Sequence, residues 1–109
     1  MKTNPTIYRQ GDVLLVQVDE VPTDAKPVAP GPVPGRHVLA YGEVTGHHHS
    51  VAVADAEMLT TAEAVFLRIM RDTTLEHQEH AAVALPKGAV FKVVRQREYT
   101  PAAIRNVAD

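Results

Sequence analysis

Residues 42–54 read GEVTGHHHSVAVA, in which a glycine-bounded turn leads into three histidines and an alternating apolar run. Apolar residues at every second position are typical of a strand with one buried face. If Val51 and Val53 mark that face, His47 and His49 lie on it as well, and the histidine between them lies on the other face. The stretch therefore predicts a hairpin whose second strand presents two neighbouring imidazoles.

A second histidine-rich stretch, residues 76–80 (EHQEH), stands in the same position relative to the next apolar run. The two stretches hold five of the six histidines of the chain. A histidine cluster beside a turn can be a surface feature without function, but its repetition favours a site. Imidazole has a pKa of about 6.5, so it both accepts and donates protons near neutral pH. The pattern predicts either acid–base chemistry or a metal site.

Other apolar segments have the length and composition of strands. Residues 13–18 (VLLVQV) are almost continuously apolar, which indicates a strand buried on both faces. Residues 64–70 (AVFLRIM) suit a helix by composition, but the neighbouring strands favour a strand in an antiparallel meander. Residues 36–43 predict a further strand, in which His37 is partly exposed. Residues 89–99 predict the longest strand, which is apolar at its start and bears arginines at its end.

These segments predict an all-β fold, a small antiparallel β-barrel or sandwich of about six to eight short strands. Thr100 and Pro101 are suited to the N-cap and first position of a helix, so a short C-terminal helix is expected over 101–107. The length of 109 residues fits a single domain, 1–109. Five prolines in residues 21–35 exclude a helix there and predict a loop, or an arm that reaches over a ligand or a second subunit.

Composition excludes several classes of function. The chain has no cysteine, which excludes disulfides, thiolate metal sites and a cysteine nucleophile. Its formal charge of −2 provides no basic surface for long nucleic acid, although a local positive pocket for a small anion is compatible with it. No signal peptide or membrane-length apolar run is evident, so we expect a cytoplasmic protein without a membrane partner. The modest core of so small a domain favours a homodimer or a higher homo-oligomer.

The histidines are accompanied by side chains that suit a phosphodiester substrate. Arginines bind phosphate through charge-assisted hydrogen bonds, and a tyrosine can donate to an oxyanion or stack on a base. This combination predicts a metal-independent phosphodiesterase for RNA-like substrates, in which one histidine deprotonates a 2′-hydroxyl and another protonates the 5′-oxygen leaving group. The products carry a 2′,3′-cyclic phosphate. The candidate catalytic residues are His47, His49 and His80, and the candidate substrate contacts are Arg9, Arg95, Arg97 and Tyr99.

The same three histidines suggest a competing metal site. His47, His49 and His80 resemble the ligand set of cupins, β-barrels with a His-x-His pair on one strand and a later histidine, which would hold a divalent transition metal. The cupin pattern also places a glutamate three or four residues after the second histidine. This chain has Val and Ala there, and its next carboxylate is Asp55. The match to cupins is therefore partial.

Four motifs resemble those of a family of small bacterial and phage proteins. They are RQGD at 9–12, GEVTGHHH at 42–49, EH at 79–80 with LPKG at 85–88, and RQREY at 95–99. On these motifs the chain is similar, from about residue 8 to residue 104, to the small non-CARF ring nucleases linked to type III CRISPR immunity.

This resemblance implies that the chain degrades cyclic oligoadenylates, the second messengers of that antiviral defence, without a metal cofactor. His47, His49 and His80 match the family pattern, whereas His48 and His77 fall at positions that vary. A cyclic oligoadenylate is anionic and rotationally symmetric, which suits a two-fold homodimer. A third interpretation is a non-catalytic binding module whose proline-rich arm mediates assembly.

Overall fold

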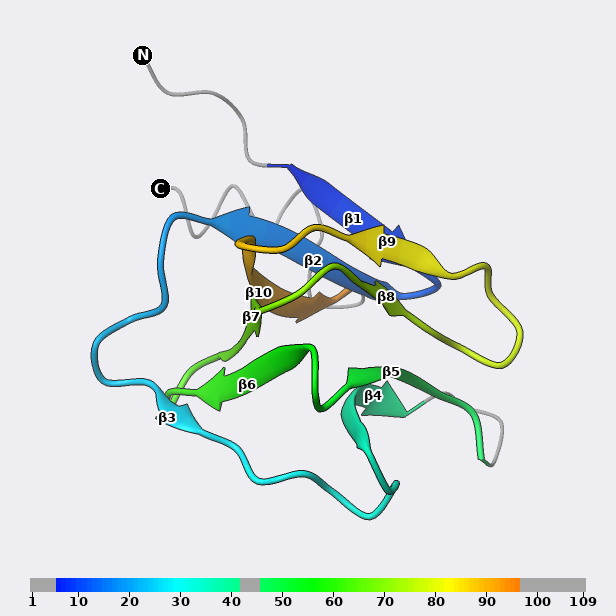
Figure 1. The fold of residues 1–109 in the computed structure, drawn as a ribbon. Helices are drawn as coiled ribbons and strands as arrows, with labels where there is room; N and C mark the ends of the chain where they lie inside the picture. The colour runs from blue at the N-terminus through cyan, green and yellow to red at the C-terminus, as the bar shows by residue number, and fades with distance from the viewer. Residues whose placement is uncertain (1–5, 42–45, 97–109) are drawn as a thin grey trace.

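The computed structural model describes residues 6–41 and 46–96, and within them the chain forms ten β-strands and no α-helix. Six strands form one antiparallel sheet in the order β1-β2-β10-β7-β6-β3, while β4 pairs with β5 and β8 with β9 (Figure 1). The strands are β1 (Ile7–Gln10), β2 (Val13–Val18), β3 (Lys26–Pro27), β4 (Arg36–Tyr41), β5 (His48–Ala52), β6 (Ala56–Thr60), β7 (Val65–Ile69), β8 (Thr73–Leu75), β9 (Val83–Leu85) and β10 (Val90–Arg95).

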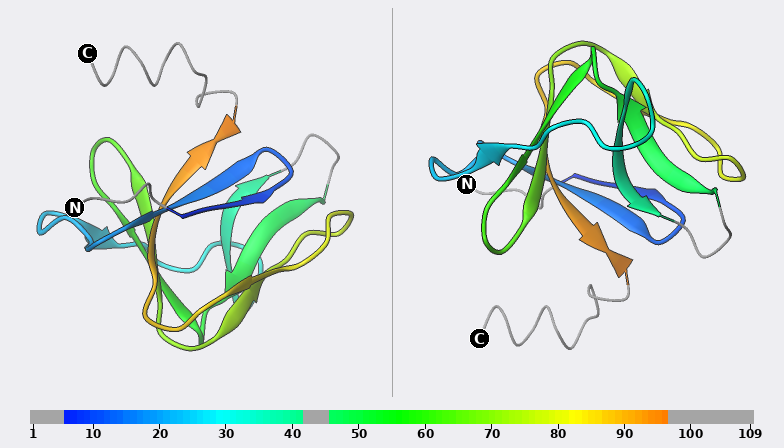
Figure 2. Two further views of the ribbon diagram at one scale, coloured as in Figure 1. Left: turned by 90° about the horizontal axis from the view of Figure 1, so that it is seen from above. Right: turned by 90° about the horizontal axis from the view of Figure 1, so that it is seen from below.

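The three sheets curve around one interior (Figure 2). Both hairpins are joined to the rest: Ser50 of β5 forms a bridge with Glu76 just after β8, and β9 lies against β1. Strands of all three sheets supply one hydrophobic core, whose fully buried members are Val13, Leu15, Val51, Leu67, Ile69, Leu75, Leu85 and Phe91. The predicted all-β antiparallel fold is confirmed, and the predicted C-terminal helix lies outside the described residues.

The apolar runs form the predicted strands. The run at 13–18 coincides with β2, although burial on both faces holds only for Val13, Leu14 and Leu15. Residues 65–69 are strand β7, so the helical alternative for that segment is wrong. The structure has more strands than expected because β3 and β8 contain no apolar run and form only by pairing with a neighbour.

The proline-rich segment 21–35 follows the edge of the large sheet. Its two-residue strand β3 pairs with β6, and the backbone N–H of Val28 donates to the carbonyl of Met58 at 2.8 Å. The segment is otherwise irregular, as its prolines predict. The part of the chain that the structure describes contains no helix long and apolar enough to cross a membrane.

His37 differs from its predicted position. It is buried, with 5% of its surface exposed, where strand alternation predicted partial exposure. The cause is a shift of register in the β4–β5 hairpin between Val38 and Ala40, which leaves Leu39 without a partner. An extra residue in one strand reverses the alternation beyond it, so that both His37 and Ala40 face the interior.

Candidate functional site

Three segments that are distant in sequence meet at one end of the structure, on the right of Figure 1: the β1–β2 turn, the start of β5 and the loop between β8 and β9. The loop is fixed beside β5 because Ser50 and Glu76 exchange two backbone hydrogen bonds, of 3.0 and 2.8 Å. The turn approaches the loop so closely that a Cβ on Gly11 would lie 2.7 Å from Nε2 of His80. This convergence brings both histidine-rich stretches to one place.

The imidazoles of the two stretches contact one another. The ring centroids of His49 and His77 are 4.4 Å apart, and those of His77 and His80 are 4.5 Å apart. His49 and His80 lie almost parallel, with their centroids separated by 6.0 Å, and His47 packs edge-on against His77 at 5.6 Å. All three predicted catalytic histidines therefore belong to one cluster, and His77 stands at its centre.

His49 is the buried member of the cluster, with 2% of its surface exposed. Burial lowers the pKa of its imidazole to about 4, and the neighbouring His77 acts in the same direction, whereas the Asp12 carboxylate opposes them. The ring is therefore neutral at pH 7 and able to accept a proton. Its Nε2 atom lies 3.6 Å from Oδ1 of Asp12.

Gln10 contacts the other nitrogen of this ring. Its Oε1 lies 2.9 Å from Nδ1 of His49. Its Nε2 donates to the carbonyls of Leu75 and Ala81, each at 2.9 Å. Gln10 is itself 2% exposed and thus connects β1, the end of β8 and the loop beyond it to the catalytic candidate.

Asp12 is held by Arg95. Nε and Nη2 of Arg95 donate to Oδ2 of Asp12 at 3.0 and 2.5 Å. Partial burial raises the pKa of the Asp12 carboxyl, but the hydrogen bond and charge of Arg95 outweigh it, so the net pKa is lowered and Asp12 is an anion at neutral pH. Arg95, predicted as a phosphate contact, is placed at the site through this ion pair.

His77 shapes the loop that carries it. Its Nδ1 accepts from the backbone N–H groups of Glu79 and His80, at 3.0 and 3.4 Å, so the ring hydrogen of the neutral form is on Nε2. Burial and the charges of His80 and His47 lower the pKa of His77. His77 thus presents a neutral N–H donor within the cluster.

The other two histidines of the first stretch differ in surroundings. Nδ1 of His47 lies 2.8 Å from Oε1 of Glu79, which links the start of β5 to the loop. Nδ1 of His48 donates to the carbonyl of Gly46 at 3.1 Å, and its backbone N–H donates to Oε1 of Gln78 at 2.8 Å. His48 lies on the opposite face of β5 from His49, as alternation predicts.

Sequence reasoning missed three members of the site, Gln10, Asp12 and His77. Asp12 follows Gly11 in a turn-like pair, and the resemblance to ring nucleases places His77, unlike His80, at a position that varies. Gln10 belongs to the RQGD motif, which was the one available signal. Arg9 is exposed and adjacent to Gln10 on β1, which directs it to the opposite face of that strand. The predicted contacts Arg97 and Tyr99 lie outside the described residues.

His47, His49 and His80, the ligands expected for the alternative metal site, are not placed to hold one metal ion. Within residues 6–41 and 46–96, no three histidine, aspartate or glutamate side chains are placed to hold one metal ion. Nδ1 of His49 faces Gln10, and Nδ1 of His47 faces Glu79.

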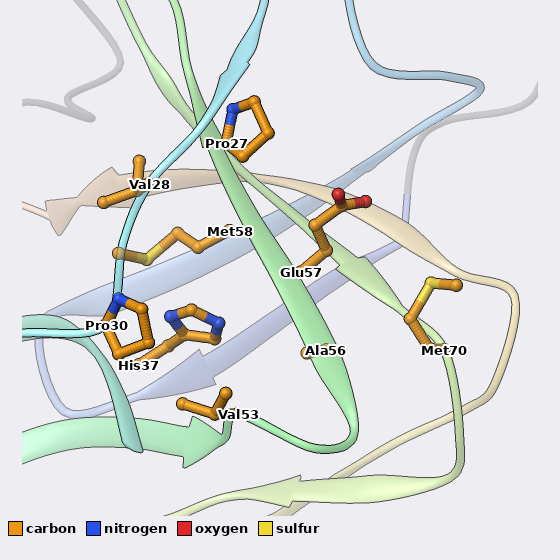
Figure 3. A pocket seen from close by; sticks show the side chains of 9 residues that line it. All are labelled: Pro27, Val28, Pro30, His37, Val53, Ala56, Glu57, Met58 and Met70. Carbon is orange, nitrogen blue, oxygen red and sulfur yellow. The ribbon is translucent and has the colours of Figure 1, made fainter. Parts of the chain in front are cut away.

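A cavity of about 410 Å³ lies elsewhere, between the proline-rich segment, β4 and β6 (Figure 3). Its lining is mainly apolar, and its charged member Glu57 is paired with Arg68 at 2.6 Å. His37 contributes to the wall, and its Nδ1 is buried without a hydrogen-bond partner. The cavity has volume but no group of converging polar side chains, so the histidine cluster is the better candidate for chemistry. The lining residues are Pro27, Val28, Pro30, His37, Val53, Ala56, Glu57, Met58 and Met70.

Comparison with known protein families gives a match over most of the chain. Residues 9–96 match the model of a family described as a domain of unknown function, DUF8820. The matched span includes all the described residues of the cluster, from Gln10 to Arg95. No curated protein and no solved structure matches the chain.

Proposed function

The chain belongs to the DUF8820 family of domains of unknown function, and we propose that it is a metal-independent phosphodiesterase that degrades cyclic oligoadenylates. One observation carries the proposal: a buried, neutral imidazole, His49, has one nitrogen engaged by Gln10 and the other directed toward Asp12 and the neighbouring histidines. The neutral ring is able to accept a proton, and the Asp12 carboxylate, which opposes the lowering of its pKa, favours the protonated form.

In the proposed reaction, Nε2 of His49 accepts the proton of a ribose 2′-hydroxyl. The 2′-oxygen then forms a bond to the adjacent phosphorus, and the bond from phosphorus to the 5′-oxygen breaks. His80, exposed at the mouth of the cluster, donates the proton that this oxygen needs to leave. Asp12 stabilises the imidazolium that forms on His49, and the N–H of His77 donates to the phosphate oxygens. The products are a 2′,3′-cyclic phosphate and a 5′-hydroxyl.

The substrate class is supported by charge and by the resemblance to ring nucleases. An overall charge of −2 disfavours long RNA, while a cyclic oligoadenylate is a small anion that needs only a local site. The motif residues His49 and His80 lie together in the structure, at a ring separation of 6.0 Å. We propose that the protein acts as a homodimer in antiviral defence, which matches a rotationally symmetric substrate.

The decisive assay is cleavage of cyclic tetra-adenylate by protein stripped of metal, in EDTA, with mass analysis of the products. Linear fragments that end in a 2′,3′-cyclic phosphate are expected, whereas a cyclic substrate methylated on its 2′-oxygens remains intact because it has no nucleophile. A long single-stranded RNA serves as the comparison and is expected to survive. No cleavage in EDTA, but cleavage after a divalent transition metal is added, would contradict the proposal and support the cupin-like alternative.

The role of His80 has a test of its own. His80→Ala is expected to slow cleavage of cyclic tetra-adenylate by about 10²-fold or more, since general acids contribute on that order. The same variant is expected to cleave a ribose 3′-phosphodiester with a nitrophenolate leaving group almost as fast as the unaltered protein, because nitrophenolate departs without a proton. Equal losses on both substrates would assign His80 another role.

A further inference from the structure

We propose that Gln10 is a positioning residue that fixes the tautomer of His49, leaving Nε2 as the unprotonated nitrogen that acts as the base. The inference deepens the proposed function and depends on it for the role of the base. The tautomer itself is a property of the protein without substrate. It can therefore be measured independently of any activity.

The amide nitrogen of Gln10 fixes the orientation of its side chain. This nitrogen has two hydrogens, and it donates them to the carbonyl oxygens of Leu75 and Ala81, both at 2.9 Å. Carbonyl oxygens only accept, so the amide cannot be turned around without placing its oxygen against two other oxygens. The oxygen Oε1 must therefore face His49.

This orientation determines which ring nitrogen of His49 carries the hydrogen. Oε1 of Gln10 lies 2.9 Å from Nδ1 of His49 in a buried environment. An amide oxygen has no hydrogen to give, so Nδ1 must carry the hydrogen of the neutral ring. The other nitrogen, Nε2, is then a free lone pair, and it is this atom that lies near Asp12. Two backbone carbonyls thus determine which nitrogen of His49 is basic.

Burial of both side chains makes this arrangement difficult to change. Gln10 and His49 are each 2% exposed, so water cannot readily replace either partner. An opposed arrangement would leave buried donors and acceptors unpaired, which is costly. The tautomer is accordingly set by the fold, whereas that of an exposed histidine such as His80 is not.

The test is long-range nitrogen–proton NMR of the histidine rings at pH 7, which separates protonated from unprotonated ring nitrogens. In the unaltered protein, Nδ1 of His49 is expected to be protonated and Nε2 unprotonated; the reverse would overturn the proposal, whatever the activity. This measurement needs no variant and no substrate. It therefore decides the inference even if a variant fails to fold.

Two variants of Gln10 separate positioning from mere support of the loop. Gln10→Glu and Gln10→Met both lose the bonds to Leu75 and Ala81, but only the glutamate keeps an oxygen opposite Nδ1. The glutamate is expected to retain the Nδ1–H form of His49, and the methionine to give a mixture of tautomers. Cleavage of cyclic tetra-adenylate by the methionine variant is expected to fall about 10²-fold or more relative to the glutamate variant. Identical tautomers in both variants would show that Gln10 has only a structural role.

Discussion

The hairpin β4–β5 buries two histidines in two different ways. His49, near the start of β5, has Gln10 at one nitrogen and Asp12 near the other, and two more imidazoles against its ring. His37, near the start of β4, lines an apolar cavity with its Nδ1 unpaired. Burial lowers the pKa of both rings. A lowered pKa and burial are thus shared by the two residues, and what distinguishes His49 is the set of polar groups around it.

This contrast separates a site from a by-product of packing. The groups around His49 come from β1, the β1–β2 turn and the β8–β9 loop, each held by its own hydrogen bonds. His37 faces inward because of a register shift in its strand. Catalysis needs groups that are oriented before the reaction begins, and only the surroundings of His49 provide them.

The largest expected difference between the two residues is in activity. His49→Asn keeps an N–H that can donate to Gln10 but removes the basic Nε2, so cleavage of cyclic tetra-adenylate is expected to fall about 10²–10⁴-fold. His37→Asn is expected to leave the rate within about twofold, since no reacting group touches that residue. The rates of the two purified variants are compared at pH 7 in EDTA. Similar losses in both variants would mean that the polar groups around His49 do not give it a different role from His37.

The next difference is in the pH dependence of stability. A histidine whose folded pKa is lowered binds protons more readily when unfolded, so the free energy of unfolding falls as the pH drops. For His49 the window runs from 6.5 down to about 4. Lowering the pH through this whole window reduces the free energy of unfolding by about 3 kcal/mol at most. Above pH 6.5 the contribution of His49 to stability is fully present.

Urea denaturation at a series of pH values measures this term as the difference between the unaltered protein and His49→Asn. The variant is expected to lose less stability on acidification. His37→Asn is expected to change the curve in the same direction, because the pKa of His37 is also lowered. If His49→Asn followed the same pH curve as the unaltered protein, His49 would not be buried in its neutral form.

The sequence predicts the strands that local composition specifies. Residues 13–18 carry enough apolar side chains to identify β2 directly, whereas the composition of residues 64–70 also suits a helix and only the neighbouring strands favour β7. β3 consists of Lys26 and Pro27, and neither residue favours a strand by itself. That strand exists because β6 lies beside it, which is a tertiary effect.

The sequence likewise predicts only part of the candidate site. Alternation placed His49 on the face of Val51, and both are buried. The meeting of His49 with His77 depends on the bridge between Ser50 and Glu76, which no local pattern reveals. Apart from its place in the RQGD motif, nothing in the sequence marks Gln10, because two of its partners are backbone carbonyls, which every residue has.

The surroundings of His49 and His37 also differ at two glycines. Gly11 beside His49 and Gly35 beside the strand of His37 both have positive φ, of 58° and 73°. A Cβ at Gly11 would lie 2.7 Å from Nε2 of His80 and 3.2 Å from Cε1 of His49, whereas a Cβ at Gly35 would meet nothing within 4 Å. An alanine at either position would be strained by the positive φ. Only at Gly11 would its Cβ also clash with neighbouring side chains.

Gly35→Ala is therefore expected to cost about 1 kcal/mol of unfolding free energy, and Gly11→Ala about 2–3 kcal/mol, measured by urea denaturation. Only Gly11→Ala is expected to reduce the cleavage rate, because it displaces two imidazoles of the cluster. An equal effect of both substitutions on activity would mean that the turn does not approach the site as described.

The smallest expected effect concerns the apolar surroundings of His37. His37→Leu removes a buried nitrogen that has no partner, but it also removes the hydrogen bond to the backbone of Ala56, so the free energy of unfolding is expected to change by less than about 1 kcal/mol. His49→Leu is expected to cost about 1–3 kcal/mol more, because it leaves Oε1 of Gln10 buried and unpaired. Parallel thermal and urea unfolding of the two variants measures the difference. A large cost for His37→Leu would show that the hydrogen bond of His37 to Ala56 stabilises the fold as strongly as the contact between His49 and Gln10 does.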